Sequence, residues 1–153
     1  MRRFVYLYLG LTGLLFALLY WDISPVARVI NGQQTQMLLY TLDMILPDGQ
    51  IQGINIIISP RYHVIITQAC NGMIPYLVLA SAILAYHKPW AHKLKWLVVG
   101  YLLFFIINVI RLLIVTYFVT MSPSYFWISH DIFGNALLMA SGLVIFYIYG
   151  RKS

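Results

Sequence analysis

The fold is decided by residues 96–121, which read WLVVGYLLFFIINVIRLLIVTYFVTM. A helix needs about 20 apolar residues to cross the hydrocarbon core of a bilayer, and this stretch exceeds that length, interrupted by Asn108 and Arg111. The whole chain of 153 residues is 61% hydrophobic and 9% charged, whereas a soluble domain averages about 25% charged residues. A soluble globular protein and a disordered chain are both excluded, and the sequence predicts an integral membrane protein.

Further apolar runs extend this prediction to about four transmembrane helices. The expected spans are about 4–21, 71–86, 96–121 and 131–149. The first run follows two arginines, as in a signal peptide, but it is long for one and its cleavage pattern is poor, so we interpret it as an anchor helix. The sequence thus predicts an all-α polytopic membrane protein in which residues 1–153 form a single membrane domain.

The charged residues predict the orientation of these spans, because Lys and Arg accumulate on the cytoplasmic side of membrane proteins. If the helices alternate, one side receives Arg2, Arg3, Lys88, Lys93, Lys95, Arg151 and Lys152. The other side receives Arg28, Arg61, Asp22, Asp43, Asp48 and Asp131. The expected location is therefore the cytoplasmic (inner) membrane, multi-pass, with both termini cytoplasmic. The lipid bilayer explains the net charge of +6, and no nucleic-acid partner is expected.

The predicted outer segment, residues 22–69, contains secondary structure of its own. Residues 26–46 mix apolar and polar positions, which favours a helix lying at the membrane interface. Two stretches rich in Ile and Val, separated by a turn, then indicate a small β-hairpin over residues 50–68. The second strand of this hairpin leads directly to Cys70 and the second span.

Cys70 lies where the expected hairpin becomes a membrane helix, on the predicted outer side. A lone cysteine in an apolar protein is commonly a small buried hydrophobe, and that interpretation stays open. Three features favour a functional thiol. Cys70 lies outside the apolar runs, and the Asn71-Gly72 pair that follows it favours an open, tightly turning backbone. Cys70 also lies at a helix N-terminus, which favours a thiolate and can bind an oxyanion. The single cysteine also excludes an internal disulfide and a multi-cysteine zinc site.

Arg111 is the most costly residue to place in a membrane, at about 2.5–3.5 kcal/mol near a helix centre. It follows Trp96 by about 22 Å of helix, which places it in the outer third of the hydrocarbon core. Asn108, three residues earlier, shares its helix face. An arginine that extends to the headgroups is the alternative, but the apolar residues 112–115 beyond it favour a polar cavity.

His130 opens the predicted fourth span on the same outer side. Ser129 is expected to cap this helix, and Asp131 lies in its first turn, where the helix dipole favours an acid and a neutral imidazole. Gly134, one turn later, leaves room beside the ring. An interfacial histidine without a task is the alternative. A cysteine, a histidine and an arginine together supply a nucleophile, its base and a group that holds an oxyanion.

These residues and their order resemble the exosortase/archaeosortase family of membrane transpeptidases. The matching motifs are Ala69-Cys70-Asn71-Gly72, Asn108-Val109-Ile110-Arg111, and His130 with Gly134. The resemblance covers about residues 50–150 and is carried by the order of the three motifs, since no single one is specific. The chain resembles the short, core-only members, and Asn71 replaces the commoner serine.

The resemblance implies a membrane cysteine protease/transpeptidase that cleaves C-terminal sorting signals at the outer face. It implies Cys70, Arg111 and His130 as catalytic residues. The expected substrate-binding residues are Asn71, Gly72, Asn108 and Gly134, and no cofactor or metal is expected. The partners would be secreted proteins with a C-terminal motif, a transmembrane helix and a basic tail. Such a protein would form a thioester with the cysteine before its release or its transfer to a surface acceptor.

From the residues alone, a non-catalytic membrane protein is the alternative. An assembly partner or a transporter would use Arg111 as an anion site. Its thiol would then be dispensable, so the two hypotheses differ in the effect of Cys70→Ala. A haem or metal protein is disfavoured, because the four histidines fall on opposite sides of the predicted bilayer.

Overall fold

The computed structural model describes residues 2–151, and its longest element is α4 (Trp90–Met121). This helix of 32 residues is about 48 Å long, well beyond the ~30 Å of a hydrocarbon core. It begins at Trp90 rather than at Trp96, directly after Pro89, which cannot continue a preceding helix but readily begins a new one. The first turns of α4 therefore carry Lys93 and extend beyond the apolar stretch.

Three segments of the described chain are long and apolar enough to cross a membrane, namely Arg2–Leu19, Trp90–Met121 and Pro123–Arg151. A further apolar helix, α3 (Met73–Ala85), has 13 residues and is about 20 Å long, less than a full span. The prediction of an all-α polytopic fold is confirmed, with one helix shorter than the expected span of residues 71–86. That helix is short because Gly72, at φ 81°, begins it and Tyr86 leaves it in an extended conformation.

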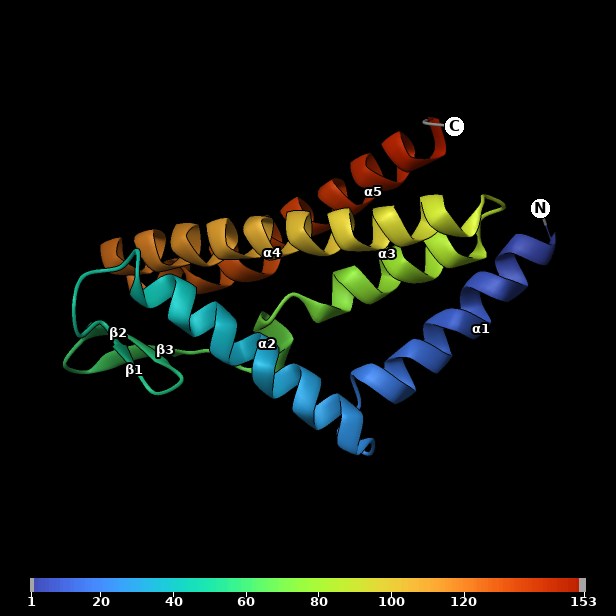
Figure 1. The fold of residues 1–153 in the computed structure, drawn as a ribbon. Helices are drawn as coiled ribbons and strands as arrows, with labels where there is room; N and C mark the ends of the chain where they lie inside the picture. The colour runs from blue at the N-terminus through green and yellow to red at the C-terminus, as the bar shows by residue number, and fades with distance from the viewer. Residues whose placement is uncertain (1, 152–153) are drawn as a thin grey trace.

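Figure 1 shows how the helices are arranged around α4. Here α1 (Arg2–Leu19) packs along α3, and α3 packs in turn on α4 and on α5 (Asn135–Arg151). No residue of α1 is buried, so α1 is a peripheral helix. The chain then reverses into α2 (Pro25–Asp43), which forms a V with α1 in Figure 1. Ser24 begins α2, since its hydroxyl oxygen accepts a hydrogen bond from the backbone N–H of Ala27 at 3.4 Å.

The expected hairpin is in fact a three-stranded antiparallel sheet, whose strands are β1 (Ile51–Gln52), β2 (Asn55–Ser59) and β3 (Tyr62–Ile65), in that order. The stretch expected to form one strand is divided because Gly53 adopts a φ of 63° and turns the chain back. One face of the sheet packs on α2 and on the C-terminal half of α4. This cluster contains Leu38, Leu42, Ile56, Val64, Ile66, Val109, Leu112, Val115 and Val119.

The last helical segment contains a π-helical stretch, η3 (Ile128–Gly134), between the short 3-10 helix η2 (Pro123–Tyr125) and α5. The chain is already helical before Ser129, so the prediction that Ser129 caps this helix is wrong. Its hydroxyl instead donates a hydrogen bond to the carbonyl oxygen of Tyr125 at 2.8 Å, as serines inside helices do. π-helical turns are rare and occur frequently at functional sites.

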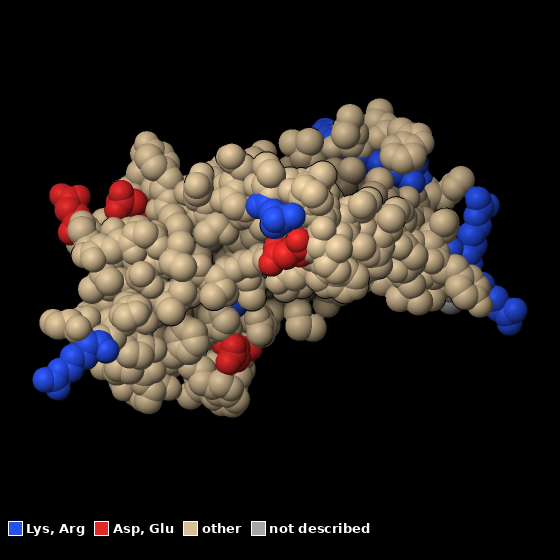
Figure 2. Space-filling model, turned by 90° about the horizontal axis from the view of Figure 1, so that it is seen from below, with Lys and Arg blue, Asp and Glu red and all other residues tan. Residues whose placement is uncertain are grey.

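Charge is distributed unevenly along the molecule. Figure 2 shows basic side chains at the end where Figure 1 places the N-terminus, and the face shown there carries no acidic side chain. Of the bases expected on the cytoplasmic side, Lys152 lies outside the described residues. The asymmetry agrees with the one read from the sequence, and the orientation of the protein in a membrane stays a prediction.

Candidate active site

Cys70 is held at the junction between the sheet and α3. After β3, two extended residues lead into the 3-10 helix η1 (Gln68–Cys70), and the left-handed Gly72 then redirects the chain into α3. The side chain of Cys70 is 7% exposed. Its Sγ lies 3.6 Å from Nε2 of His130 and 3.6 Å from the hydroxyl oxygen of Thr67. The thiol therefore lies in a polar pocket rather than among hydrocarbon side chains alone.

The surroundings of Cys70 favour its ionised form. Burial raises the pKa of the thiol, but hydrogen bonds with His130 and Thr67 outweigh burial and lower this pKa to about 7. The thiol therefore ionises more readily than an ordinary cysteine. A thiolate is the reactive form of cysteine, so this environment is one that activates a nucleophile.

His130 lies in η3 and connects the thiol to a carboxylate. Its Nδ1 is 2.7 Å from Oδ1 of Asp131, and its ring stacks on Phe126 at 5.0 Å between ring centroids. If Nδ1 carries the proton and donates it to Asp131, the lone pair of Nε2 faces the thiol of Cys70. This is the arrangement of a general base whose orientation is fixed by an acid.

Asp131 lies in the first turn of η3, as predicted, and its carboxylate also pairs with the neighbouring His130. Neighbouring residues of an α-helix do not normally face each other, so adjacency gave no reason to pair Asp131 with His130. Here both residues lie in a π-helical stretch, and their side chains meet. The sequence signal was the His-Asp dipeptide itself at the opening of an apolar span.

Arg111 extends from α4 into the same group and is 3% exposed. Its Nη2 lies 3.1 Å from Nε2 of His130 and donates to Oδ1 of Asn135 at 3.4 Å, while Nη1 donates to Oδ1 of Asn108 at 3.4 Å. Among the described residues, Nε of Arg111 has no hydrogen-bond partner. Asn135 was missed, although a polar residue in an apolar span, five positions after His130, was a signal for it.

Asn108 and Gly72 fix the backbone at the nucleophile. The side-chain amide of Asn108 is fully buried and donates to the carbonyl oxygen of Cys70 at 2.8 Å. A Cβ on Gly72 would lie 3.1 Å from the Asn108 side chain, and its φ of 81° is unfavourable for other residues. The structure thus gives both residues contacts within the protein, and their predicted role in substrate binding stays a prediction.

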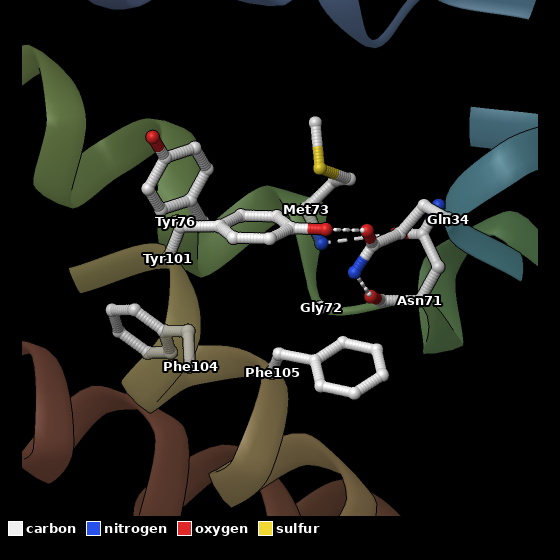
Figure 3. Close-up of a pocket in the computed structure, with 8 residues that line it drawn as sticks. All are labelled: Gln34, Asn71, Gly72, Met73, Tyr76, Tyr101, Phe104 and Phe105. Atoms are coloured by element: carbon white, nitrogen blue, oxygen red, sulfur yellow. Dashed lines mark hydrogen bonds between the residues drawn. The ribbon is translucent and has the colours of Figure 1, made fainter. Parts of the chain in front are cut away.

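Asn71 belongs to a buried polar network that the sequence analysis did not foresee (Figure 3). Its Nδ2 donates to Oδ1 of Asn31 at 2.9 Å, and its Oδ1 accepts from the backbone N–H of Met73 at 2.9 Å. Its carbonyl oxygen accepts from Gln34, whose side-chain oxygen accepts from the hydroxyl of Tyr101 at 2.5 Å. The network ties the Cys70 segment to α2 and α4. A signal for it was the glutamine and asparagine content of the predicted interfacial helix.

Gly134 provides space, but for Arg111 rather than for the imidazole ring as predicted. A Cβ at this position would lie 2.5 Å from Nε of Arg111 and 3.1 Å from the carbonyl oxygen of Ser129. The buried glycine therefore allows the guanidinium to approach the backbone of η3. Its contribution to substrate binding is untested.

The members of the group differ in exposure. Cys70 and Arg111 are buried, whereas the side chain of His130 is 17% exposed and that of Asp131 is 46% exposed. Within residues 2–151, no group of three or more His, Cys, Asp or Glu side chains is placed to hold a metal ion.

Comparison with known proteins identifies the family. The family model described as transmembrane exosortase (Exosortase_EpsH) matches residues 2–147 of the chain. The chain belongs to the transmembrane exosortase family. A curated protein of Methanocaldococcus jannaschii, described as probable archaeosortase E, is 25% identical over 140 residues, which cover 88% of this chain and 73% of that protein. No solved structure matches the chain.

Family membership confirms the resemblance inferred from the three motifs. It supports a multi-pass membrane location and, in general terms, a membrane transpeptidase role for this exosortase-family chain. All three motifs lie within the matched residues. In the structure they come together around Cys70, although they are separated in the sequence by up to 60 positions.

Proposed function

We propose that this chain is a membrane cysteine protease/transpeptidase that cleaves C-terminal sorting signals at the outer face of the cytoplasmic membrane. One observation carries the proposal: Nε2 of His130 lies 3.6 Å from Sγ of Cys70 and 3.1 Å from Nη2 of Arg111, with the three side chains supplied by separate elements. The substrates are secreted proteins whose C-terminus consists of a short motif, a membrane helix and a basic tail.

In the first half-reaction the scissile peptide bond is exchanged for a thioester. Nε2 of His130 takes the thiol proton while Sγ of Cys70 bonds to the substrate carbonyl carbon, and Asp131 stabilises the imidazolium through Nδ1. Arg111 holds the negative charge that develops on the carbonyl oxygen. The imidazolium then gives its proton to the leaving nitrogen, the C–N bond breaks, and the membrane helix with its basic tail departs.

In the second half-reaction the thioester is transferred to an acceptor. Water or an acceptor amine or hydroxyl loses a proton to Nε2 of His130 and attacks the thioester carbon. The C–S bond breaks, and Cys70 regains its proton from His130. Arg111 holds the second oxyanion as it held the first.

The proposed orientation places this chemistry outside the cell, with both termini in the cytoplasm. It is supported by the group of bases at one end of the molecule, where Figure 2 shows no acidic side chain, and by the position of Arg111 in the second half of α4. A substrate helix would enter from the bilayer, with its motif at the outer interface. A membrane-impermeant maleimide added to intact cells should then label Cys70, and labelling only after lysis would contradict this orientation.

The test of the proposed function is co-expression with a tailed protein from the same genome. Cleavage of the tail is followed on immunoblots, relative to the amount of enzyme in the membrane fraction. Wild-type enzyme should shorten the substrate, and Cys70→Ala should not. Cleavage by Cys70→Ala at the wild-type rate would exclude the thioester mechanism and favour the non-catalytic alternative, in which Arg111 binds an anion.

A further inference from the structure

We infer that the free edge of β3 binds the substrate segment that precedes the scissile bond, as an added parallel β-strand that leads into Cys70. The inference deepens the proposed function and rests on it. It assigns a binding mode to a surface with which no motif was associated. The substrate class is an extended polypeptide, recognised mainly through its backbone rather than through its side chains.

The edge is free because of the order of the sheet. Among the described elements, β1 packs against α2 and β2 against α4, whereas β2 is the one element with which β3 makes extensive contact. Natural proteins commonly protect a sheet edge with Lys, Pro or a covering element. The strand Tyr62-His63-Val64-Ile65 contains neither of these residues.

The register identifies which backbone groups face outward. Ile65 is paired with Asn55, and the N–H of Ile66 donates to the carbonyl oxygen of Ile54 at 2.8 Å. In an antiparallel ladder this bond marks Ile65 as a residue whose own N–H and C=O point away from β2. By the same alternation, the N–H and C=O of His63 also point outward. Both residues are exposed, so the sheet face that carries their side chains is uncovered.

A parallel strand fits these groups. The N–H of one substrate residue would donate to the carbonyl oxygen of His63, and its C=O would accept from the N–H of Ile65. The substrate residue two positions later would donate to the carbonyl oxygen of Ile65. Only alternate substrate residues would therefore form bonds with β3.

The direction of the added strand follows from the chain itself. β3 begins at the turn beyond β2 and runs toward Cys70, from which the chain enters the apolar helix α3. A secreted protein anchored by a C-terminal helix also runs toward the membrane as it approaches its motif. The two segments are therefore parallel, and the acyl side of the scissile bond lies on β3.

The edge is also within reach of the nucleophile. Ile65 and Cys70 are separated by at most about 17 Å of extended chain. Six residues of extended substrate span about 20 Å, which is enough to cover the edge with the last carbonyl carbon at Sγ. Unpaired backbone groups near the hydrocarbon core are costly, so the unpaired edge of β3 gains from a peptide partner that replaces water.

The inference is tested on the full-length protein in detergent with peptidyl chloromethyl ketones, which alkylate a thiolate by forming an S–C bond and expelling chloride. The probes are acetyl-alanyl and acetyl-hexaalanyl chloromethyl ketone, which share the reactive group. Alkylation of Cys70 is followed by intact-protein mass spectrometry. We expect the longer probe to react on the order of tenfold faster, since each backbone hydrogen bond contributes modestly. Equal rates for the two probes would overturn the inference and leave the proposed nucleophile standing.

Two N-methylated versions of the longer probe provide the sharpest control on the wild-type protein. One version carries methyl groups on the odd-numbered amides and the other on the even-numbered amides. One set should abolish the gain and the other should retain it, because only alternate amides face β3. The inference would be overturned if both N-methylated probes reacted as slowly as the shorter probe, or if both reacted as fast as the unmethylated longer probe. Failure of Cys70 to react with any probe in the folded protein would contradict the proposed function as well.

A matched pair of variants tests the protein side. Ile65→Pro removes an outward N–H without removing a bond between β2 and β3, and proline is tolerated at such edge positions. Ile65→Ala retains the N–H and shortens the side chain. The rate ratio between the longer and shorter probes, measured within each variant, should fall several-fold for Ile65→Pro and persist for Ile65→Ala. An unchanged ratio in Ile65→Pro would show that β3 does not bind the peptide.

Discussion

The two ends of the helix bundle, called outer and inner after the proposed orientation, each contain a histidine stacked on an aromatic ring. At the outer end, His130 stacks on Phe126 at 5.0 Å between ring centroids with an angle of 11°. At the inner end, His92 stacks on Tyr149 at 5.2 Å with an angle of 27°. The two rings have similar apolar surroundings, so stacking alone does not distinguish them.

The polar partners do distinguish the two histidines. His130 faces a thiol, a guanidinium and a carboxylate. Nε2 of His92 is buried and has no hydrogen-bond partner among the described residues. The comparison teaches that the capacity for proton transfer lies in the neighbours of the ring, which the fold brings together from α4, η1 and η3.

The packing of the two ends differs in the same way. The inner half is an apolar cluster of Leu79, Ile83, Trp96, Phe104, Leu138, Ile145 and Tyr149. Buried polar residues around the thiol, by contrast, are Asn31, Gln34, Asn71, Asn108 and Arg111. Burying such residues is costly unless their hydrogen bonds are satisfied. The structure of the outer end therefore depends on specific hydrogen bonds as well as on packing.

The largest effect is expected from removing the thiol itself. Cys70→Ser should reduce tail cleavage to background, because a hydroxyl is far less acidic than a thiol and the group is arranged for a thiolate. Cleavage of a co-expressed tailed substrate is compared with enzyme level in the membrane fraction. A serine variant with substantial activity would mean that the low pKa of Cys70 is unimportant for the reaction.

The two histidines provide a matched pair for the next largest effect. His130→Ala should lower the cleavage rate by on the order of 100-fold or more, the usual contribution of a general base. His92→Ala should leave the rate near that of the wild type, since no polar group depends on that ring. The measurement is the initial rate of tail cleavage at equal membrane-fraction protein. Similar losses in both variants would show that stacking, rather than chemistry, explains the role of His130.

The sequence was sufficient for the fold class and for three residues that the structure brings together, because hydropathy and motif order are local signals. It predicted one strand where Gly53 divides two, and a full span where α3 has 13 residues. The pairing of Asp131 with His130 was not predicted, because the π-helical geometry that turns this carboxylate toward the ring has no distinct hydropathy pattern. Gln34 and Asn31 were missed because their partner Asn71 is distant in sequence and is found only through tertiary packing.

Arg111→Lys tests the role of the guanidinium, because it retains the positive charge and removes the planar group with its several N–H donors. If Arg111 merely extended to the headgroups, a lysine would replace it with little loss. In the proposed site, however, one guanidinium contacts Asn108, His130 and Asn135 at once, which an ammonium group cannot do in the same geometry. Cleavage should fall at least tenfold, the lower part of the range for loss of an oxyanion donor. Arg61→Lys, an exposed arginine in the sheet turn, is the control.

The pH dependence of Cys70 alkylation tests the link between the thiol and His130. The thiol pKa of about 7 is lower than its ordinary value, so the thiolate is present above pH 7 and is lost as the pH falls below it. Alkylation of the wild type by iodoacetamide should therefore have its midpoint near pH 7. In His130→Ala the midpoint should move upward, and the rate at pH 7 should fall by up to about tenfold. An unchanged midpoint would show that His130 does not stabilise the thiolate.

The smallest effect is expected from a methyl group placed beside the guanidinium. In Gly134→Ala the new Cβ would lie 2.5 Å from Nε of Arg111, so the arginine must move, whereas in Gly142→Ala the nearest atom is the end of the Phe104 ring at 3.3 Å. Both substitutions favour helix formation, so neither should reduce the amount of protein in the membrane. Small displacements of a catalytic group are costly, and we expect a loss of about three- to tenfold for Gly134→Ala alone.

A double-mutant cycle decides whether Gly134 acts through Arg111. If it does, adding Gly134→Ala to Arg111→Lys should cost much less than the product of the two single losses, because the lysine variant has already lost the guanidinium whose position the methyl group would disturb. Independent losses that simply multiply would assign Gly134 to the backbone of η3 instead, through the carbonyl oxygen of Ser129 at 3.1 Å. The inner-end pair, Gly142→Ala with Arg111→Lys, should show no coupling. Coupling of Arg111→Lys with Gly134→Ala but not with Gly142→Ala would show that catalysis depends on the position of the guanidinium and not on the general packing of α5.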